Sequence, residues 1–421
     1  MEILYSRCCG LDVHKASVTA CCRWRDEVDH RSRKEIRRFG TYTSDLLDLA
    51  QWLQQHQVEQ VGMESTGSYW RPVWNVLESR GLPLLLANAQ HIKNVPGRKT
   101  DTLDPEWISD LLMHGLIRPS FVPGQKMRDL RDMTRMRSKV VQDHTRVVNR
   151  IQALLEDANI KLGNVVSDIL GLSSRAMLQG LIEGRAPGEL AELAQGRLRA
   201  KLEPLAKALE GHFRPEHGFL LQRMLMQTRF LEQQERALRR QIERHLDNQA
   251  QQAVALWDTI PGVNQAIGWV LAAEMGTRTE QFPDAHHAAS WTAICPGNRE
   301  SGGKRRSGKM RKGNPWLRAA LCEAAWAASR SKGTYLAALY RRMAGRKGHK
   351  RAIVAVAHAI LIIAYQMLNN NQPYRELGEN YFDNIKPEKT ADRLVRRLQK
   401  MGYQVFIQKP AAGKGAPATT T

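Results

Sequence analysis

The chain has 421 residues and a formal net charge of +21 at pH 7. Hydrophobic residues make up 42% of it, which excludes a disordered chain and allows two or three domains with a large core. Sixteen Lys and Arg residues against two acidic ones lie between Arg299 and Arg351, a net +14 within this segment. Charge concentrated in this way predicts a nucleic-acid surface, with a membrane or general solubility role as the alternative.

The first 120 residues have the pattern of an α/β domain with a mixed sheet. Strands are expected at residues 8–14, 17–24, 35–40, 58–63 and 82–87. Amphipathic helices are expected after residue 44 and at 69–80. The order β-β-β-α-β-α-β, followed by helices, is typical of an α/β fold.

The cysteines and the apolar segments favour a protein of the reducing cytoplasm. Cys8–Cys9 and Cys21–Cys22 are adjacent pairs on predicted strands, where buried free thiols are expected rather than disulfides or zinc ligands. The N-terminus lacks a secretory signal pattern. Residues 352–368 are apolar on every face but short and interrupted by His358, so we expect a buried core helix and no membrane contact.

Four acidic residues stand at the turns of the N-terminal region. Asp12 and Glu64 end predicted strands, and Asp101 and Asp104 precede a helix that runs to about His114. Strand ends in an open α/β sheet are where sites form, and converging carboxylates in so basic a chain favour a divalent cation between them. The sequence therefore suggests a Mg²⁺ site, although Asp104 before Pro105 is also a plausible helix N-cap.

The middle of the chain is helical. Residues 125–157 and 219–248 have apolar stripes at helical spacing, which predict a paired-helix arm or a dimerisation element. Residues 160–215 are expected to form shorter helices, and the segment beyond about residue 408 is expected to be disordered.

Two later segments have features of phosphate binding. The turn Pro261-Gly262-Val263 would expose the backbone N–H groups of Gly262 and Val263 between two helices, unless this is an ordinary helix hairpin. The glycine-rich run 295–318 carries two hydroxyls, Ser301 and Ser307, as candidate nucleophiles. It contains no His to act as base, so activation has to come from elsewhere, such as the metal. Its anion-binding cations are Lys304, Arg305, Arg306, Lys309, Arg311 and Lys312.

These motifs together resemble the DEDD transposases of bacterial insertion sequences, the group related to the pilin-gene invertases and understood as bridge-RNA-guided recombinases. The resemblance extends from about residue 8 to 370. It is carried by GLDVHK, VGMESTGSYW, KTDTLD, IPGV, ESGGK and KMRKGNPWLR, in that order along the chain.

The resemblance implies a RuvC-like, RNase H-fold domain over residues 1–120, a coiled-coil linker over 121–250, and an all-α transposase domain with a helix-hairpin-helix over 251–380. Residues 381–421 form an extension. It implies Mg²⁺ bound by Asp12, Glu64, Asp101 and Asp104, and Ser301 as the nucleophile with Ser307 in reserve. It also implies donor and target double-stranded DNA, a structured guide RNA, and a homo-oligomer, dimer or tetramer, with composite active sites.

Two other functions fit parts of the sequence. A hydrolytic junction endonuclease needs the carboxylates and no serine, and a non-catalytic architectural protein needs only the basic surface. The chain contains no GxxxxGK[ST] loop, as expected for strand exchange that conserves energy in an ester.

Overall fold

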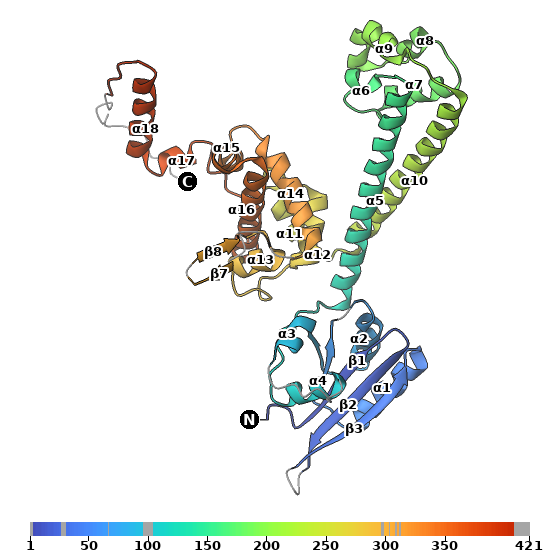
Figure 1. Ribbon diagram of the computed structural model, residues 1–421, viewed down its shortest axis with the longest axis vertical. Coiled ribbons are helices and arrows are strands. Elements are labelled where there is room, and N and C mark those ends of the chain that lie inside the picture. The colour runs from blue at the N-terminus through green and yellow to red at the C-terminus, as the bar shows by residue number, and fades with distance from the viewer. Residues whose placement is uncertain are drawn as a thin grey trace. The chain divides into compact units, whose positions relative to one another are not determined.

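The computed structural model describes residues 3–26, 31–65, 67–95, 104–295, 299–302, 304–307, 310 and 313–407. The chain divides into two compact units, Met1–Gly124 and Gln125–Thr421, coloured blue to cyan and cyan to red in Figure 1. The division of the second unit at residues 250 and 380 stays a prediction. Asp101, Lys309, Arg311, Lys312 and the tail beyond residue 407 lie outside the described residues.

A six-stranded mixed sheet organises the first unit, in the order β3-β2-β1-β4-β5-β6. Strands β1, β2 and β3 are antiparallel neighbours, whereas β4 and β5 run parallel to β1. The predicted α/β class and the order of the elements are confirmed. The strands are β1 (Arg7–Val13), β2 (Ser17–Arg25), β3 (Ser32–Gly40), β4 (Gln60–Glu64), β5 (Leu84–Ala87) and β6 (Pro119–Ser120).

Helices cover both faces of this sheet. Helices α1 (Thr43–Gln55) and α2 (Trp70–Ser79) pack on one face, where Leu11, Leu49 and Met63 share a core. Helix α4 (Asp104–Met113) packs on the other, with Cys8, Ile108 and Leu112 among the buried residues, and short α3 (Ala89–Asn94) lies beside it. The four cysteines at 8, 9, 21 and 22 are buried and free, as predicted, and burial raises the pKa of Cys8 to about 12.

Two long helices, α5 (Gln125–Asp157) and α10 (Pro215–His245), lie side by side in the second unit (Figure 1). Helix α10 begins earlier than predicted because Pro215 suits the first helical position. At one end of the pair, short helices share a core that includes Leu155, Leu178 and Leu205. They are α6 (Leu162–Val165), α7 (Leu172–Ile182), α8 (Pro187–Glu192), a 3₁₀ segment (Gly196–Lys201) and α9 (Leu202–Leu209).

The remaining helices pack around α16 (His349–Asn370). This is the described helix long and apolar enough to cross a membrane, yet Ile353, Val356 and Ile360 on it are buried in the core, as expected of a core helix. The rest of this part consists of α11 (Asn248–Asp258), α12 (Gln265–Met275), α13 (Ala285–Thr292), β7 (Arg299–Ser301), β8 (Lys304–Ser307), α14 (Pro315–Ser329), α15 (Tyr335–Lys347), α17 (Tyr381–Asn384) and α18 (Pro387–Lys400).

Candidate active site

Three of the four predicted carboxylates belong to one edge of the sheet in the first unit. Strands β1 and β4 pair in parallel, with Gly10 opposite Gly62 and Leu11 opposite Met63. The next residues on the two strands are Asp12 and Glu64. Their backbones are about 5 Å apart, which is the usual distance between neighbouring strands. Because side chains alternate along a strand, both project on the face opposite Leu11 and Met63.

Two glycines bring the third carboxylate to the same face. A Cβ on Gly10 would lie 2.2 Å from the carbonyl oxygen of Pro105 and 2.6 Å from the Ser109 nitrogen, so α4 rests directly on the strand backbone. A Cβ on Gly62 would lie 2.6 Å from Cδ1 of Leu112. This close approach carries Asp104, the first residue of α4, toward Asp12. We call Asp12, Glu64 and Asp104 the acidic edge.

Electrostatics show that the three charges interact. Burial raises the pKa of Asp12 above its ordinary value, and the charges of Asp104 and Glu64 raise the pKa further. His14 opposes them, since its Nε2 lies 3.1 Å from Oδ2 of Asp12 and lowers that pKa. Like charges that raise the pKa of Asp12 in this way favour a bound cation, because a cation removes the repulsion.

The donor set suits Mg²⁺. The acidic edge offers carboxylate oxygens, the hard ligands that this ion takes, typically one or two carboxylates together with waters and substrate phosphate. Within the ranges that the structure describes, no three Asp, Glu, His or Cys side chains converge as a complete metal cluster. Asp101, the fourth predicted ligand, lies outside those ranges.

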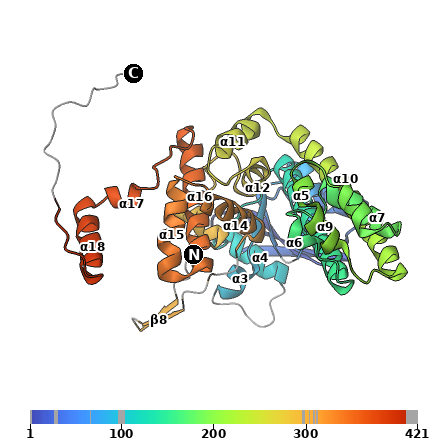
Figure 2. The same ribbon diagram turned by 90° about the horizontal axis from the view of Figure 1, so that it is seen from above.

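The candidate nucleophiles belong to a two-stranded hairpin, β7–β8, which we call the serine hairpin. Ser301 pairs with Lys304 next to the turn, whereas Ser307 pairs with Arg299 at the open end. Gly302 has a φ of 59°, which the turn requires. A flexible loop was predicted here, so the strands are a correction; the hairpin projects from the helices around it (Figures 1 and 2). Lys304, Arg305 and Arg306 form β8 with Ser307.

The Pro-Gly turn packs inward. Gly262 has a φ of 88°, and a Cβ there would lie 2.3 Å from the carbonyl oxygen of Ala324 on α14. Val263 is buried, and its N–H donates to the carbonyl of Ile260. These contacts account for both residues as packing between helices, the alternative that the sequence left open.

The segment that contains the serine hairpin ends at Asn314, and a buried carboxylate holds this C-terminal end in place. Glu274 on α12 has a side chain only 1% exposed, and Arg135 of α5 donates to both its oxygens at 2.6 and 2.9 Å. Arg131 lies 3.6 Å away and also binds the carbonyls of Ala273 and Glu274. Nδ2 of Asn314 donates to the same carboxylate at 2.7 Å. We call these four side chains, at 131, 135, 274 and 314, the Glu274 network.

Both ends of that segment are held together. Oδ1 of Asn314 accepts from the N–H groups of Trp316 and Leu317, which confirms the predicted cap of α14. A Cβ on Gly313 would lie 2.5 Å from that of Ala293, the left-handed residue that ends α13. The two ends of the segment that contains the hairpin, at Ala293 and Gly313, are therefore held close together by packing.

Two residues of this arrangement were missed from the sequence. His14 sits in the GLDVHK motif, two residues after Asp12, and strand alternation alone places it on the same face. Glu274 is the single charge in an otherwise apolar helix, AIGWVLAAEM, and a lone acid in such a helix needs a buried partner. That signal was available, but its partners are 139 or more residues away or across a loop.

Comparisons with known proteins relate both parts of the chain to transposases. A family model described as "Transposase" matches residues 9–160, and one described as "Transposase IS116/IS110/IS902 family" matches residues 254–341. The chain is also 26% identical over 324 residues to a Pseudomonas aeruginosa protein named "Probable family 20 transposase", covering 75% of this chain and 85% of that protein. The chain is thus an insertion-sequence transposase, with the two domains of the IS110 family.

Proposed function

We propose that this transposase cuts and rejoins DNA through a phosphoserine ester on Ser301, assisted by Mg²⁺ at Asp12, Glu64, Asp101 and Asp104. The observation that carries the proposal is the acidic edge, a set of interacting carboxylates in a chain of net charge +21. A DNA-binding protein gains nothing from such a cluster unless the cluster has a cation to hold.

The carboxylates are the residues that would hold the ion, and the ion would supply charge neutralisation at the reacting phosphate. Asp12 and Glu64 are fixed by neighbouring strands and Asp104 by the start of α4, so rigid elements orient all three. His14 adds a contact to Asp12, because Nε2 of its imidazole lies 3.1 Å from Oδ2.

The covalent chemistry conserves phosphodiester bonds. Oγ of Ser301 loses its proton and bonds to phosphorus, while one sugar oxygen of the cleaved strand leaves and is protonated to a hydroxyl. Attack by a sugar hydroxyl from another strand then reverses these changes and restores the serine. No water enters and no net hydrolysis occurs, so ATP is not required.

The cations of the run 304–312 would bind the backbone phosphates and offset developing charge. They are Lys304, Arg305, Arg306, Lys309, Arg311 and Lys312. Gly262 and Val263, packed as described, would contribute only through the backbone of their turn.

The partners that we propose follow the resemblance. They are donor and target double-stranded DNA and a structured guide RNA, bound in the bacterial cytoplasm at the nucleoid. The acidic edge and the serine belong to different compact units. We propose a homo-oligomer, either a dimer or a tetramer. In it, the carboxylates of one protomer and the serine of another would form a composite active site.

Strand cleavage by serine variants tests the proposal. Ser301→Ala should abolish cleavage of a substrate duplex with its guide RNA and Mg²⁺, whereas Ser307→Ala should retain it. Cleavage that persists in both variants would contradict the serine chemistry and favour a hydrolytic endonuclease. Cleavage lost only in Ser307→Ala would assign the nucleophile to the other end of the hairpin.

A further inference from the structure

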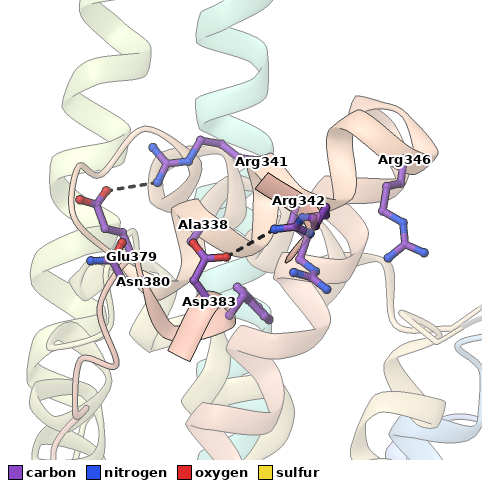
Figure 3. A pocket seen from close by; sticks show the side chains of 9 residues that line it. Ala338, Arg341, Arg342, Arg346, Glu379, Asn380 and Asp383 are labelled. Atoms are coloured by element: carbon purple, nitrogen blue, oxygen red, sulfur yellow. Dashed lines mark hydrogen bonds and ion pairs between the residues drawn. The ribbon is translucent and has the colours of Figure 1, made fainter. Parts of the chain in front are cut away.

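The C-terminal part of the chain contains an arginine-rich site outside the serine hairpin, and most of its residues lie beyond residue 341, where the second family-model match ends. Helices α15, α17 and α18 border an open pocket of about 550 Å³ (Figure 3). Its cations are Arg341, Arg342, Arg346 and Arg393, and its acids are Glu379 and Asp383. We propose that this pocket, which we call the arginine pocket, binds the phosphate backbone of duplex DNA.

The two acids of the pocket neutralise only part of its charge. Arg341 lies 3.3 Å from Glu379, and Arg393 lies 3.6 Å from Asp383. All four side chains are at least half exposed, so these ion pairs are weak and a phosphate can displace them. Figure 3 shows Arg346 apart from both acids, and within the described ranges its side chain has no hydrogen bond or ion pair.

Aromatic packing orients one of the arginines. The guanidinium of Arg342 lies 5.1 Å from the ring centre of Phe382, and that ring stacks on Tyr335. Cation–π contact restrains the guanidinium and leaves its N–H groups available, which suits the bidentate recognition of a phosphate. The pocket is thus partly preorganised for an anion.

Helix α18 extends the positive surface from the pocket. Five cations and one acid, Asp392, line a hollow on it, and Arg393 lines both hollows; the cations are Lys389, Arg393, Arg396, Arg397 and Lys400. From Lys389 to Lys400 the helix rises about 16 Å. B-DNA presents a phosphate charge for every ~1.7 Å of its axis, so a row of this length can face several phosphates.

Duplex DNA is favoured over a membrane as the partner. The helix also exposes Leu394 and Leu398, as membrane-surface helices do. However, the arginines come from two helices, α15 and α18, and line an open pocket, whereas a helix in a lipid interface lies flat. A transposase acts on DNA, which supplies the polyanion.

Neutralising the pocket measures its contribution. The variant Arg342→Gln/Arg346→Gln/Arg393→Gln should bind a 30-base-pair duplex roughly tenfold more weakly near 0.15 M salt, measured by fluorescence anisotropy without Mg²⁺. Its log–log salt dependence should be shallower by roughly 2 to 3. A matched control, Arg185→Gln/Arg197→Gln/Arg199→Gln, removes the same charge from the exposed α7–α9 region and should change the slope by less than ~1.

Two further variants separate a built site from bulk charge. Replacing the same three pocket arginines by Lys keeps the charge and should still weaken binding severalfold, because Lys lacks the planar fork. Glu379→Gln/Asp383→Asn should tighten DNA binding severalfold, because the pocket loses its two acids. The control Glu183→Gln/Glu192→Gln removes the same charge elsewhere and should tighten DNA binding less.

Three results would overturn the inference. The first is a Gln variant of the pocket whose DNA affinity and salt slope equal those of the α7–α9 control variant. The second is a loss confined to vesicles containing phosphatidylserine, and the third is a loss confined to an RNA hairpin, with duplex binding intact. DNA binding without Mg²⁺ requires neither Ser301 nor the acidic edge, so failure here leaves the proposed chemistry untouched.

Discussion

The acidic edge and the Glu274 network place carboxylates in opposite situations. At the acidic edge, Asp12 is 27% exposed; burial and the two neighbouring acids raise its pKa, while His14 lowers it. Glu274 is 1% exposed and has two arginines and an amide around it. Asp12 is thus repelled by its two acidic neighbours, whereas the charge of Glu274 is neutralised by arginines of the same chain.

This difference distinguishes a candidate active site from a structural ion-pair network. A buried carboxylate with its cations supplied by the fold serves architecture, because nothing further has to bind. A carboxylate whose pKa is raised by burial and by neighbouring acids, as that of Asp12 is, costs stability and is retained for a ligand or for chemistry. The comparison therefore predicts opposite effects of mutation on activity and on stability.

The largest effect is expected on cleavage. Asp12→Asn or Glu64→Gln should reduce Mg²⁺-dependent strand cleavage by roughly a thousandfold or more, because the charge that would hold the ion is lost. Single-turnover cleavage on gels measures this. Glu323→Gln, an exposed acid on α14, is the control and should cleave normally. Full activity in both acidic-edge variants would favour a non-catalytic architectural protein.

Loss of the Glu274 network should lower the stability of the fold. Glu274→Ala leaves Arg131 and Arg135 without their carboxylate and should lower the free energy of unfolding by about 3 kcal/mol. Glu323→Ala should stay within about 0.5 kcal/mol of the parent chain. Urea denaturation measures both, and a Glu274→Ala change as small as the control's would contradict the structural role.

The approach of α4 to the sheet can be tested at a glycine. Gly10→Ala would place a methyl group 2.2 Å from the Pro105 carbonyl, so α4 has to move away. We expect a loss of about 2 kcal/mol and a severe loss of cleavage, because Asp104 moves with α4. Gly188→Ala, with open space around its Cβ, is the control. Unfolding curves that coincide would refute this packing argument.

The smallest effect has the opposite sign. Because the pKa of Asp12 is raised on folding, the folded chain binds the proton more tightly than the unfolded chain, and the ionised residue costs stability at pH 7. Without metal, Asp12→Asn should raise the Tm by roughly 1–3 °C. This gain should fade as the pH falls through the raised, folded-state pKa, and should vanish below the unfolded-state pKa, where Asp12 is neutral in both states.

Added Mg²⁺ supplies the complementary measurement. It should raise the Tm of the parent chain by mass action and leave that of Asp12→Asn nearly unchanged. Differential scanning calorimetry with and without the ion gives both values. An equal response in the two chains would place the ion elsewhere.

Much of the N-terminal fold followed from local pattern. Strand alternation and apolar helical stripes predicted the β-β-β-α-β-α-β order, and two strand ends located Asp12 and Glu64. The parallel pairing of β1 with β4 is a long-range property, because β2, β3 and α1 lie between these two strands in the chain, and no local pattern predicts it. What makes the edge compact is the contact of α4 with Gly10 and Gly62, which the sequence shows only as two glycines in strands.

The C-terminal half was harder to predict. Its glycine-rich basic run suggested a flexible loop, since glycine weakens strands, but residues 299–301 and 304–307 pair across a turn at Gly302. The clamp at Gly313 and Asn314 depends on α12 and α13, which are distant or separated by the loop itself. Contacts of that kind have no periodic signature.

The most direct test is to trap the protein–DNA adduct during cleavage with Mg²⁺ and identify the modified residue by peptide mass spectrometry. The account predicts a nucleotide on Ser301, absent when Mg²⁺ is removed or when Asp12 is replaced by Asn. Cleaved DNA with no protein attached, or an adduct that forms equally well in Asp12→Asn, would contradict it.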